Sequence, residues 1–240
     1  MKLGKRLFSW QNREVRGGRQ LKHIELEKVN VGFGRGNRRR QVLKNLSLRV
    51  GRGECLAIYG SEGAGKSTLL AIIAGLLELD EGEAVVGTYN LTNCSTEEKA
   101  LMRREEMGIY SEEAPLFAEL TVQENIAFLA ALQQKKRNKV WLKEVAGHFG
   151  VSPLLALPTK ELGHYDCQAV RLARAAAAEP AVFLVDGPID LELFQKLQQW
   201  ARKRQQTILF ATSSYEEALW APHIVELDNG AIREWGGSKC

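Results

Sequence analysis

The chain is poor in cysteine and contains no long apolar run. Its four cysteines, at positions 55, 94, 167 and 240, form no Cys-x-x-Cys pair and no Cys/His metal pattern, so we interpret them as reduced thiols. The longest apolar run, Leu69–Leu77, has nine residues including a glycine, whereas a membrane-spanning helix needs about 20. The first residues lack the apolar core and cleavage site of a secretory signal. These absences predict a cytoplasmic protein without a membrane span.

Positive charge is confined to short segments. Of the net charge of +4, residues 1–22 carry +6, from seven Lys/Arg and one Glu, so the other 218 residues carry −2. A second basic segment, GRGNRRR at 34–40, has the composition of an exposed turn. We therefore divide the chain into a basic leader, 1–22, and one globular domain, 23–240. Because the charge is local, we expect no specific nucleic-acid partner.

The basic leader has a weak amphipathic pattern. Leu3, Leu7 and Trp10 fall at helical spacing, and lysine and arginine side chains surround them. Such a pattern suits a helix that lies on an anionic membrane surface. Residues 1–20 are thus a candidate membrane contact, and a solvated basic tail is the alternative.

Alternating apolar residues predict an α/β domain. Residues 24–33 and 41–50 are expected to form two strands joined by a polar turn, and 54–60 a third strand. Further strands are predicted at 83–88, 107–111, 181–185, 207–211 and 223–228. Between them we expect helical spacing over 122–146, interrupted by KKRNK, a loop with a short helix at most over 147–158, and a helix over 168–179. Strands that alternate with helices in the second half indicate a parallel core.

One glycine-rich segment carries a specific signal for phosphate binding. Residues 60–68 read GSEGAGKST, which matches G-x-x-x-x-G-K-[ST] between a predicted strand and a predicted helix. The glycines let backbone N–H groups face phosphate oxygens, and the helix N-terminus favours the anion. Lys66 then supplies a charge to the β- and γ-phosphates, and the hydroxyl of Ser67 binds Mg²⁺. The residues of this loop are Gly60, Ser61, Glu62, Gly63, Ala64, Gly65, Lys66, Ser67 and Thr68. The carboxylate of Glu62 is expected to weaken nucleotide binding.

Four segments in this order resemble the ATP-binding subunit of ABC transporters. They are GSEGAGKSTLL, LFAELTVQENI at 116–126, RLARAAAAEP at 171–180 and HIVELDNGAIREWG at 223–236, and the likeness covers about residues 23–236. The resemblance implies an α/β P-loop NTPase of ABC type: a parallel core sheet, an antiparallel β layer and a helical subdomain near 93–165. It also implies a dimer in which each ATP lies between the P-loop of one chain and the signature loop of the other.

The resemblance assigns roles to individual residues of this chain. Phe33 matches the aromatic residue that stacks on adenine. Asp186 ends an apolar strand where the family places the aspartate that orients Mg²⁺. Glu112 stands at the position of a glutamine that also contacts the metal. The implied cofactors are therefore ATP and Mg²⁺, with Ser67, Asp186 and Glu112 as the candidate metal ligands.

Several positions depart from the family pattern. Gly187 stands where the family has the glutamate that serves as general base, and Ser213 stands where it has a histidine that contacts the γ-phosphate. The signature loop, commonly LSGGQ, is replaced by Leu162, Gly163, His164, Tyr165 and Asp166. The connection after Gly187 is about three residues short and ends in Ile189-Asp190. Loss of one positioned base lowers a rate by about 10² to 10⁴, so we predict no confident catalytic residue.

The predicted function is an ATP-binding, poorly or non-hydrolysing subunit of an ABC transporter complex, on the cytoplasmic face of the membrane. Its expected partners are a permease, contacted by the helical subdomain and the Glu112 loop, and a second ABC ATPase subunit, with a heterodimer favoured over a homodimer. One alternative is an active ATPase with a relocated base, Asp190 or Glu113. Another is a soluble nucleotide-responsive interaction module.

Overall fold

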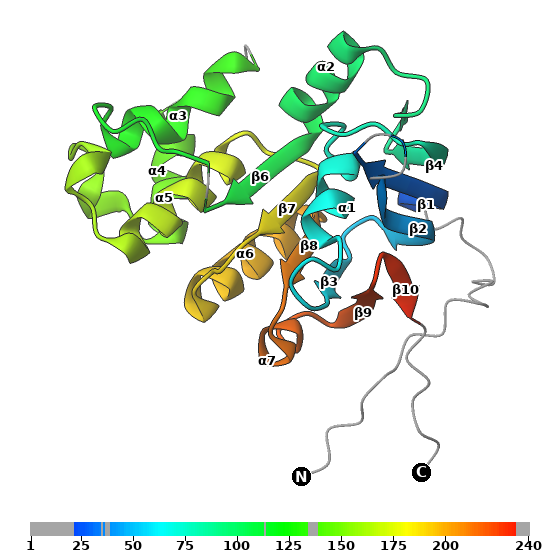
Figure 1. Cartoon of the computed structure of the whole chain (residues 1–240). Coiled ribbons are helices and arrows are strands. Elements are labelled where there is room, and N and C mark those ends of the chain that lie inside the picture. The colour runs from blue at the N-terminus through cyan, green and yellow to red at the C-terminus, as the bar shows by residue number, and fades with distance from the viewer. Residues whose placement is uncertain (1–21, 35, 37–38, 113, 134–138, 234–240) are drawn as a thin grey trace, which may run out of the picture.

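A computed structural model describes residues 22–34, 36, 39–112, 114–133 and 139–233 (Figure 1). The leader's candidate membrane contact, residues 1–20, and the candidate base Glu113 lie outside the described residues. The first part of the described chain consists mostly of strands: β1 (Lys22–Phe33), β2 (Arg40–Gly51), β3 (Cys55–Tyr59), then helix α1 (Lys66–Ile73), β4 (Glu81–Val86) and β5 (Tyr89–Asn90). The predicted strands over 24–33, 41–50 and 54–60 are confirmed.

Helices and parallel strands alternate in the rest of the chain. The elements are α2 (Thr96–Glu106), β6 (Met107–Ser111), α3 (Val122–Leu132), α4 (Lys139–Phe149), α5 (His164–Ala177), β7 (Val182–Asp186), α6 (Leu191–Arg204), β8 (Thr207–Thr212), α7 (Tyr215–Ala218), β9 (His223–Asp228) and β10 (Ala231–Arg233). Short 3₁₀ turns occupy Ser152–Leu154 and Thr159–Glu161.

The strands form two sheets. The six-stranded sheet has the order β10-β9-β3-β8-β7-β6, in which every pair is parallel except β9 and β10. The other sheet, β2-β1-β4-β5, is antiparallel. The predicted combination of a parallel core with an antiparallel β layer is confirmed. Strand β6 falls inside the range 93–165 expected for the helical subdomain and forms an edge of the core sheet.

Apolar residues cover both faces of the six-stranded sheet. Along β7, Leu184 belongs to one buried cluster, whereas Phe183 and Val185 belong to the other, since successive side chains of a strand point to opposite faces. The first cluster includes α1 and the antiparallel sheet, and the second includes helices α3 to α6. Figure 1 shows α3, α4 and α5 grouped at one end of the molecule and the antiparallel sheet at the other, with the core sheet between them. The predicted P-loop, residues 60–68, follows β3 and therefore extends from a strand inside this core sheet.

The helix boundaries correct the sequence prediction in two places. The helix predicted over 168–179 extends from His164 to Ala177, because Gly163 adopts an extended N-cap conformation and the chain turns left-handed at Glu179 before Pro180. Residues 147–149, predicted as loop, form the last turn of α4, where Phe149 is buried. The start of α3 at Val122 agrees with the prediction, and the start of α2 was missed; both carry a sequence signal, since Ser95 and Thr121 each form a capping box with a glutamate three residues later.

Candidate nucleotide site

The carboxyl ends of four neighbouring parallel strands meet at one edge of the core sheet. In the register, Ser111 lies opposite Asp186, Asp186 lies opposite Ala211, and Tyr59 lies opposite Thr212. The positions singled out from the sequence come directly after these residues: Gly60 of the P-loop after β3, Ser213 after β8, Gly187 after β7 and Glu112 after β6. The fold therefore brings residues from distant parts of the chain to one ligand-binding edge.

The P-loop depends on glycine at two crowded places. A Cβ atom added at Gly60 would lie 2.2 Å from the carbonyl oxygen of Leu227, and one added at Gly65 would lie 2.9 Å from a methyl carbon of Leu43. Gly65 also has φ +106°, in the left-handed region that glycine adopts readily. The loop can therefore curl against β2 and β9 and lead directly into α1, whose first residue is Lys66.

The side chain of Lys66 folds back over its own loop. Its Nζ atom donates to the carbonyl oxygens of Gly60 and Ser61, each at 2.8 Å. Burial lowers the pKa of Lys66, and the carboxylates of Asp186 and Glu62 act against this shift. The ammonium group thus lies at the P-loop mouth, where a nucleotide phosphate can replace the two carbonyl partners.

Ser67 and Asp186 meet beneath the loop. The hydroxyl of Ser67 donates to Oδ1 of Asp186 at 3.0 Å, which joins the start of α1 to the end of β7. A hydroxyl and a carboxylate are hard oxygen ligands of the kind Mg²⁺ takes together with phosphates and water. Among the described residues no group of three or more His, Cys, Asp or Glu could hold a metal ion. Glu112 as a further ligand stays a prediction.

The expected base position has a backbone suited to glycine. Gly187 has φ +116°, a conformation that side chains of L-residues rarely adopt. A Cβ atom there would still have room, since its nearest neighbours are the backbone N and Cβ of Glu112 at 3.7 Å. Just after it, the hydroxyl of Tyr110 donates to the carbonyl of Pro188 at 2.9 Å. Backbone conformation, not crowding, is what disfavours a glutamate at this position.

The candidate base Asp190 has a structural role. Its carboxylate caps α6 by accepting from the backbone N–H of Glu192 at 2.8 Å, and its own N–H donates to Oε1 of Gln168 at 3.1 Å. Both contacts fix the short connection after Gly187 against α5 and α6. A relocated base at Asp190 would have to act from this capping position.

Ser213 lies exposed between β8 and α7. The hydroxyls on either side of it already form hydrogen bonds. That of Thr212 donates to Glu217 at 2.5 Å, and that of Ser214 caps α7. A short hydroxyl at position 213 has less reach and no imidazole nitrogen to offer a phosphate. Position 213 therefore offers a phosphate only a short hydroxyl.

The predicted signature positions, Leu162–Asp166, lead from the Thr159–Glu161 turn into the first turn of α5. Gly163 is the N-cap and offers no side-chain cap, and a ring nitrogen of His164 lies 2.9 Å from Nε2 of Gln168. The Tyr165 side chain is 39% exposed and the Asp166 carboxylate lies in the first turn. That carboxylate complements the helix dipole but opposes an incoming phosphate at the same end. The first turn of α5 thus presents two rings and a carboxylate.

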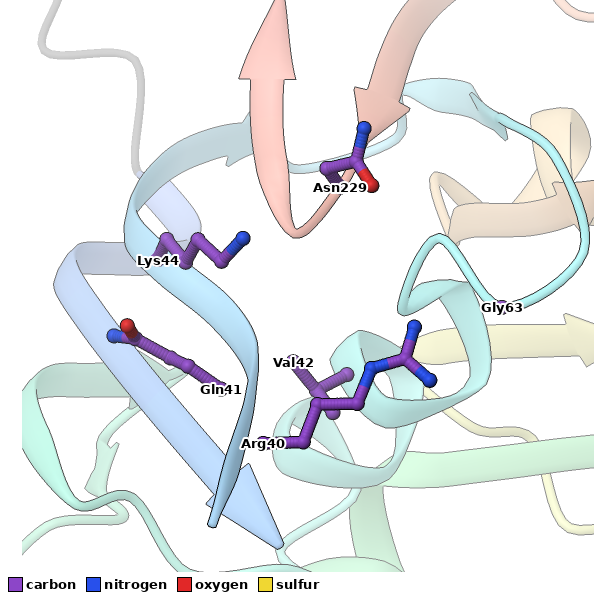
Figure 2. Close-up of a pocket in the computed structure, with 6 residues that line it drawn as sticks. All are labelled: Arg40, Gln41, Val42, Lys44, Gly63 and Asn229. Atoms are coloured by element: carbon purple, nitrogen blue, oxygen red, sulfur yellow. The ribbon is translucent and has the colours of Figure 1, made fainter. Parts of the chain in front are cut away.

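A cavity of about 400 Å³ opens beside the P-loop. Its lining residues come from β2, the P-loop and the β9–β10 turn: Arg40, Gln41, Val42, Lys44, Gly63 and Asn229 (Figure 2). Phe33, the candidate adenine partner, is 47% exposed and pairs with Arg40 in the β1–β2 register. The sequence analysis did not assign Arg40, Lys44 or Asn229 to the site. The basic run ending at Arg40 was a signal that could have suggested this cavity.

These features define a P-loop nucleotide-binding domain. Residues 43–190 match the model of the ABC transporter family. The chain is 31% identical over 221 residues to the lipoprotein-releasing system ATP-binding protein LolD of Ehrlichia chaffeensis, with 88% of this chain and 93% of that protein covered. It is 32% identical over 207 residues to the sulfate/thiosulfate import ATP-binding protein CysA of a Synechocystis strain, with 82% of this chain but 57% of that protein covered. The chain therefore belongs to the ABC transporter family and is an ATP-binding domain of that family.

Solved structures agree on the fold. The dimeric post-hydrolysis structure of the ATP-binding cassette MJ0796 with ADP and Pi superimposes with a TM-score of 0.79 at 24% identity, and covers 88% of this chain and 96% of that one. The structure of cbiO1 from Clostridium perfringens gives 0.77 at 22% identity, with coverage of 88% and 87%. The predicted ABC-type fold is confirmed. Among the described residues, none of the helices has the length and apolarity to span a membrane.

Proposed function

We propose that this chain is an ATP-binding subunit of an ABC transport complex that binds Mg²⁺ and ATP but hydrolyses ATP poorly or not at all. The observation that carries the proposal is the contrast after β7: Asp186 is joined to Ser67, but the next residue, Gly187, has no side chain to activate water. Since a general base and preorganised donors each contribute about 10² to 10⁴ in rate, binding survives their loss and turnover does not.

The proposed partners are a permease and a second ABC ATPase subunit, at the cytoplasmic face of the membrane. In a homodimer, both composite sites would combine a P-loop that lacks its glutamate with the altered turn at 162–166. With a competent partner chain, each composite site would lack only one of these. We therefore favour a heterodimer, in which this chain acts as a structural or regulatory half.

The alternative is an active ATPase with a relocated base. The carboxylate of Asp190 caps α6, so Asp190 could act as the base only if the short connection after Gly187 rearranges. A soluble nucleotide-responsive module without a permease is the third possibility, and isolation of the native complex with identification of its chains would separate it from the other two.

The experiment that tests the proposal is phosphate release from the purified full-length chain with Mg²⁺ and ATP, with the Lys66→Ala variant as background. We expect equal, background-level release from both proteins, while ATP binding is detected by calorimetry for the wild type. Turnover that Lys66→Ala abolishes would overturn the non-hydrolysing assignment and favour the active alternative. A wild-type chain that binds no ATP would overturn the nucleotide-binding role itself.

A further inference from the structure

We infer that Arg40 and Lys44 form a cationic wall of the nucleotide site and bind the phosphate-bearing side of the nucleotide from outside the P-loop. The inference rests on the proposed nucleotide-binding function and adds two binding residues to it. Both side chains line the cavity beside the P-loop, together with Gly63. In Figure 2 the guanidinium of Arg40 and the ammonium of Lys44 both point into the space between β2, the P-loop and the β9–β10 turn.

The charge balance around the P-loop calls for additional cations. Glu62 lies within the loop, and Asp186 and Glu112 follow at the adjoining strand ends, so three carboxylates share this edge with the ammonium of Lys66. A nucleotide polyphosphate adds further negative charge. Bound Mg²⁺ offsets part of it. Cations on the open side of the loop attract the anion further.

Arg40 and Lys44 are available for this role. The neighbouring Arg39 is paired with Asp80, and Arg233 is paired with Asp228. By contrast, within the described part of the chain neither Arg40 nor Lys44 forms an ion pair with a carboxylate. An unpaired guanidinium directed at a P-loop can bind phosphate oxygens without first breaking another ion pair.

The cavity wall is held in place by backbone hydrogen bonds. The N–H of Lys44 donates to the carbonyl of Gly230 at 2.8 Å, and the N–H of Gly230 donates to the carbonyl of Ala64 in the P-loop at 3.1 Å. A Cβ atom at Gly230 would lie 2.0 Å from the carbonyl oxygen of Val42, so the turn fits tightly against β2. The two cations are therefore carried on a strand tied to the phosphate-binding loop.

The path of a bound nucleotide also passes these residues. Phe33 and Arg40 lie opposite each other in the β1–β2 register, and Gly63 borders the same cavity as Arg40. A nucleotide with its base at Phe33 and its phosphates at Lys66 must run alongside this wall. Because both cations line a cavity that Gly63 of the P-loop also borders, we expect them to respond to the phosphates and not to the base.

The test compares Arg40→Gln, Lys44→Gln and the double variant with matched controls that lose the same charges on exposed helical surface, Arg202→Gln on α6 and Lys143→Gln on α4. Titration calorimetry measures the Kd for ATP, ADP and adenosine at low and high salt. Exposed charge pairs are worth little individually, so we expect ATP binding to weaken about two- to fivefold for each variant and about tenfold for the double variant. The loss should be smaller for ADP, absent for adenosine, and reduced at high salt.

Unchanged ATP affinity in the double variant, with binding still weakened at least tenfold by Lys66→Ala, would overturn the cationic wall and leave the proposed function intact. An equal loss for ATP and adenosine would also overturn it, since the two residues would then contact base or ribose. Absence of ATP binding in the wild-type chain would instead overturn the proposed function. Thermal unfolding of each variant, compared with its matched control, reports any loss of folding.

Discussion

The P-loop and the turn at the start of α5 are both glycine-containing entries into a helix, and they have different chemistry. Before α1, the chain keeps the glycines, Lys66 and a Ser67 hydroxyl bonded to Asp186 at 3.0 Å. Before α5, a single glycine caps the helix, and a histidine, a tyrosine and an aspartate fill the first turn. The start of α1 thus has the groups that bind phosphate, whereas the start of α5 presents two rings and a carboxylate.

Under the proposed function, this difference separates ATP binding from ATP hydrolysis within one domain. ATP binding in the family uses the P-loop of one chain, whereas turnover needs in addition a base after the aspartate of β7 and a signature turn from a second chain. Lys66, Ser67 and Asp186 match the first set, and the proposed function assigns the loss of the second set to Gly187 and to residues 162–166. Variants at these positions can break or sharpen the contrast, and Lys66 should have the largest effect.

Loss of the Lys66 ammonium should produce the largest effect. In Lys66→Ala, ATP affinity should fall about tenfold to hundredfold, since a charge-assisted hydrogen bond contributes about 1.5–3 kcal/mol. Titration calorimetry measures the change, and Lys143→Ala, on the exposed face of α4, serves as the control. Unchanged affinity in Lys66→Ala would show that the P-loop end does not bind nucleotide, and the contrast between the two helix starts would lose its basis.

Insertion of the missing carboxylate should not restore turnover. Gly187→Glu places a glutamate at φ +116°, which we expect to destabilise the fold by about 1–3 kcal/mol. Gly187→Ala is the matched control, because it has the same backbone strain without the carboxylate. Chemical denaturation should give similar losses for both variants, and phosphate release should stay at background in both. Turnover regained only in Gly187→Glu would show that the single missing side chain accounts for the defect.

Asp190 should affect stability and not hydrolysis. Asp190→Ala removes the cap on α6 and should lower the free energy of unfolding by about 1 kcal/mol, whereas Asp190→Asn keeps a capping oxygen and should be nearly neutral. Denaturation measures both changes. Any residual phosphate release should be the same in Asp190→Asn and in the wild type. A loss of turnover in the asparagine variant without a loss of stability would identify Asp190 as a relocated base.

The features that sequence could predict are local ones. The P-loop follows from glycine, lysine and serine at fixed spacing between a strand and a helix, and the meeting of Gly60, Asp186 and Ser213 at one edge follows from the parallel strands that precede them. The start of α5 was placed four residues too late, because Gly163 caps it through backbone conformation alone, without the serine or aspartate that marks an N-cap in sequence.

The features that sequence could not predict depend on contacts between distant segments. The cavity beside the P-loop exists because the turn at Asn229 and Gly230 sits between β2 and Ala64, and nothing in the spacing of these residues indicates that contact. The left-handed backbone at Gly187 is likewise set by the short connection that Tyr110 and Gln168 hold in place. That position 187 is a glycine is visible in the sequence, but the left-handed backbone that disfavours a larger residue there is not.

The smallest expected effect concerns the one carboxylate inside the P-loop. Glu62 is exposed, and its charge opposes the lowering of the Lys66 pKa by burial, so the carboxylate acts electrostatically on the ammonium. A nucleotide phosphate at Lys66 would be repelled by the same carboxylate. Glu62→Gln keeps the size of the side chain and removes the charge, and should strengthen ATP binding about two- to fivefold, in line with an exposed charge pair.

Glu161→Gln, near the start of α5, is the matched control and should leave the ATP affinity of the isolated chain unchanged. If both variants change the affinity equally, the effect comes from net charge, and the P-loop end is no more tuned for phosphate than the α5 end.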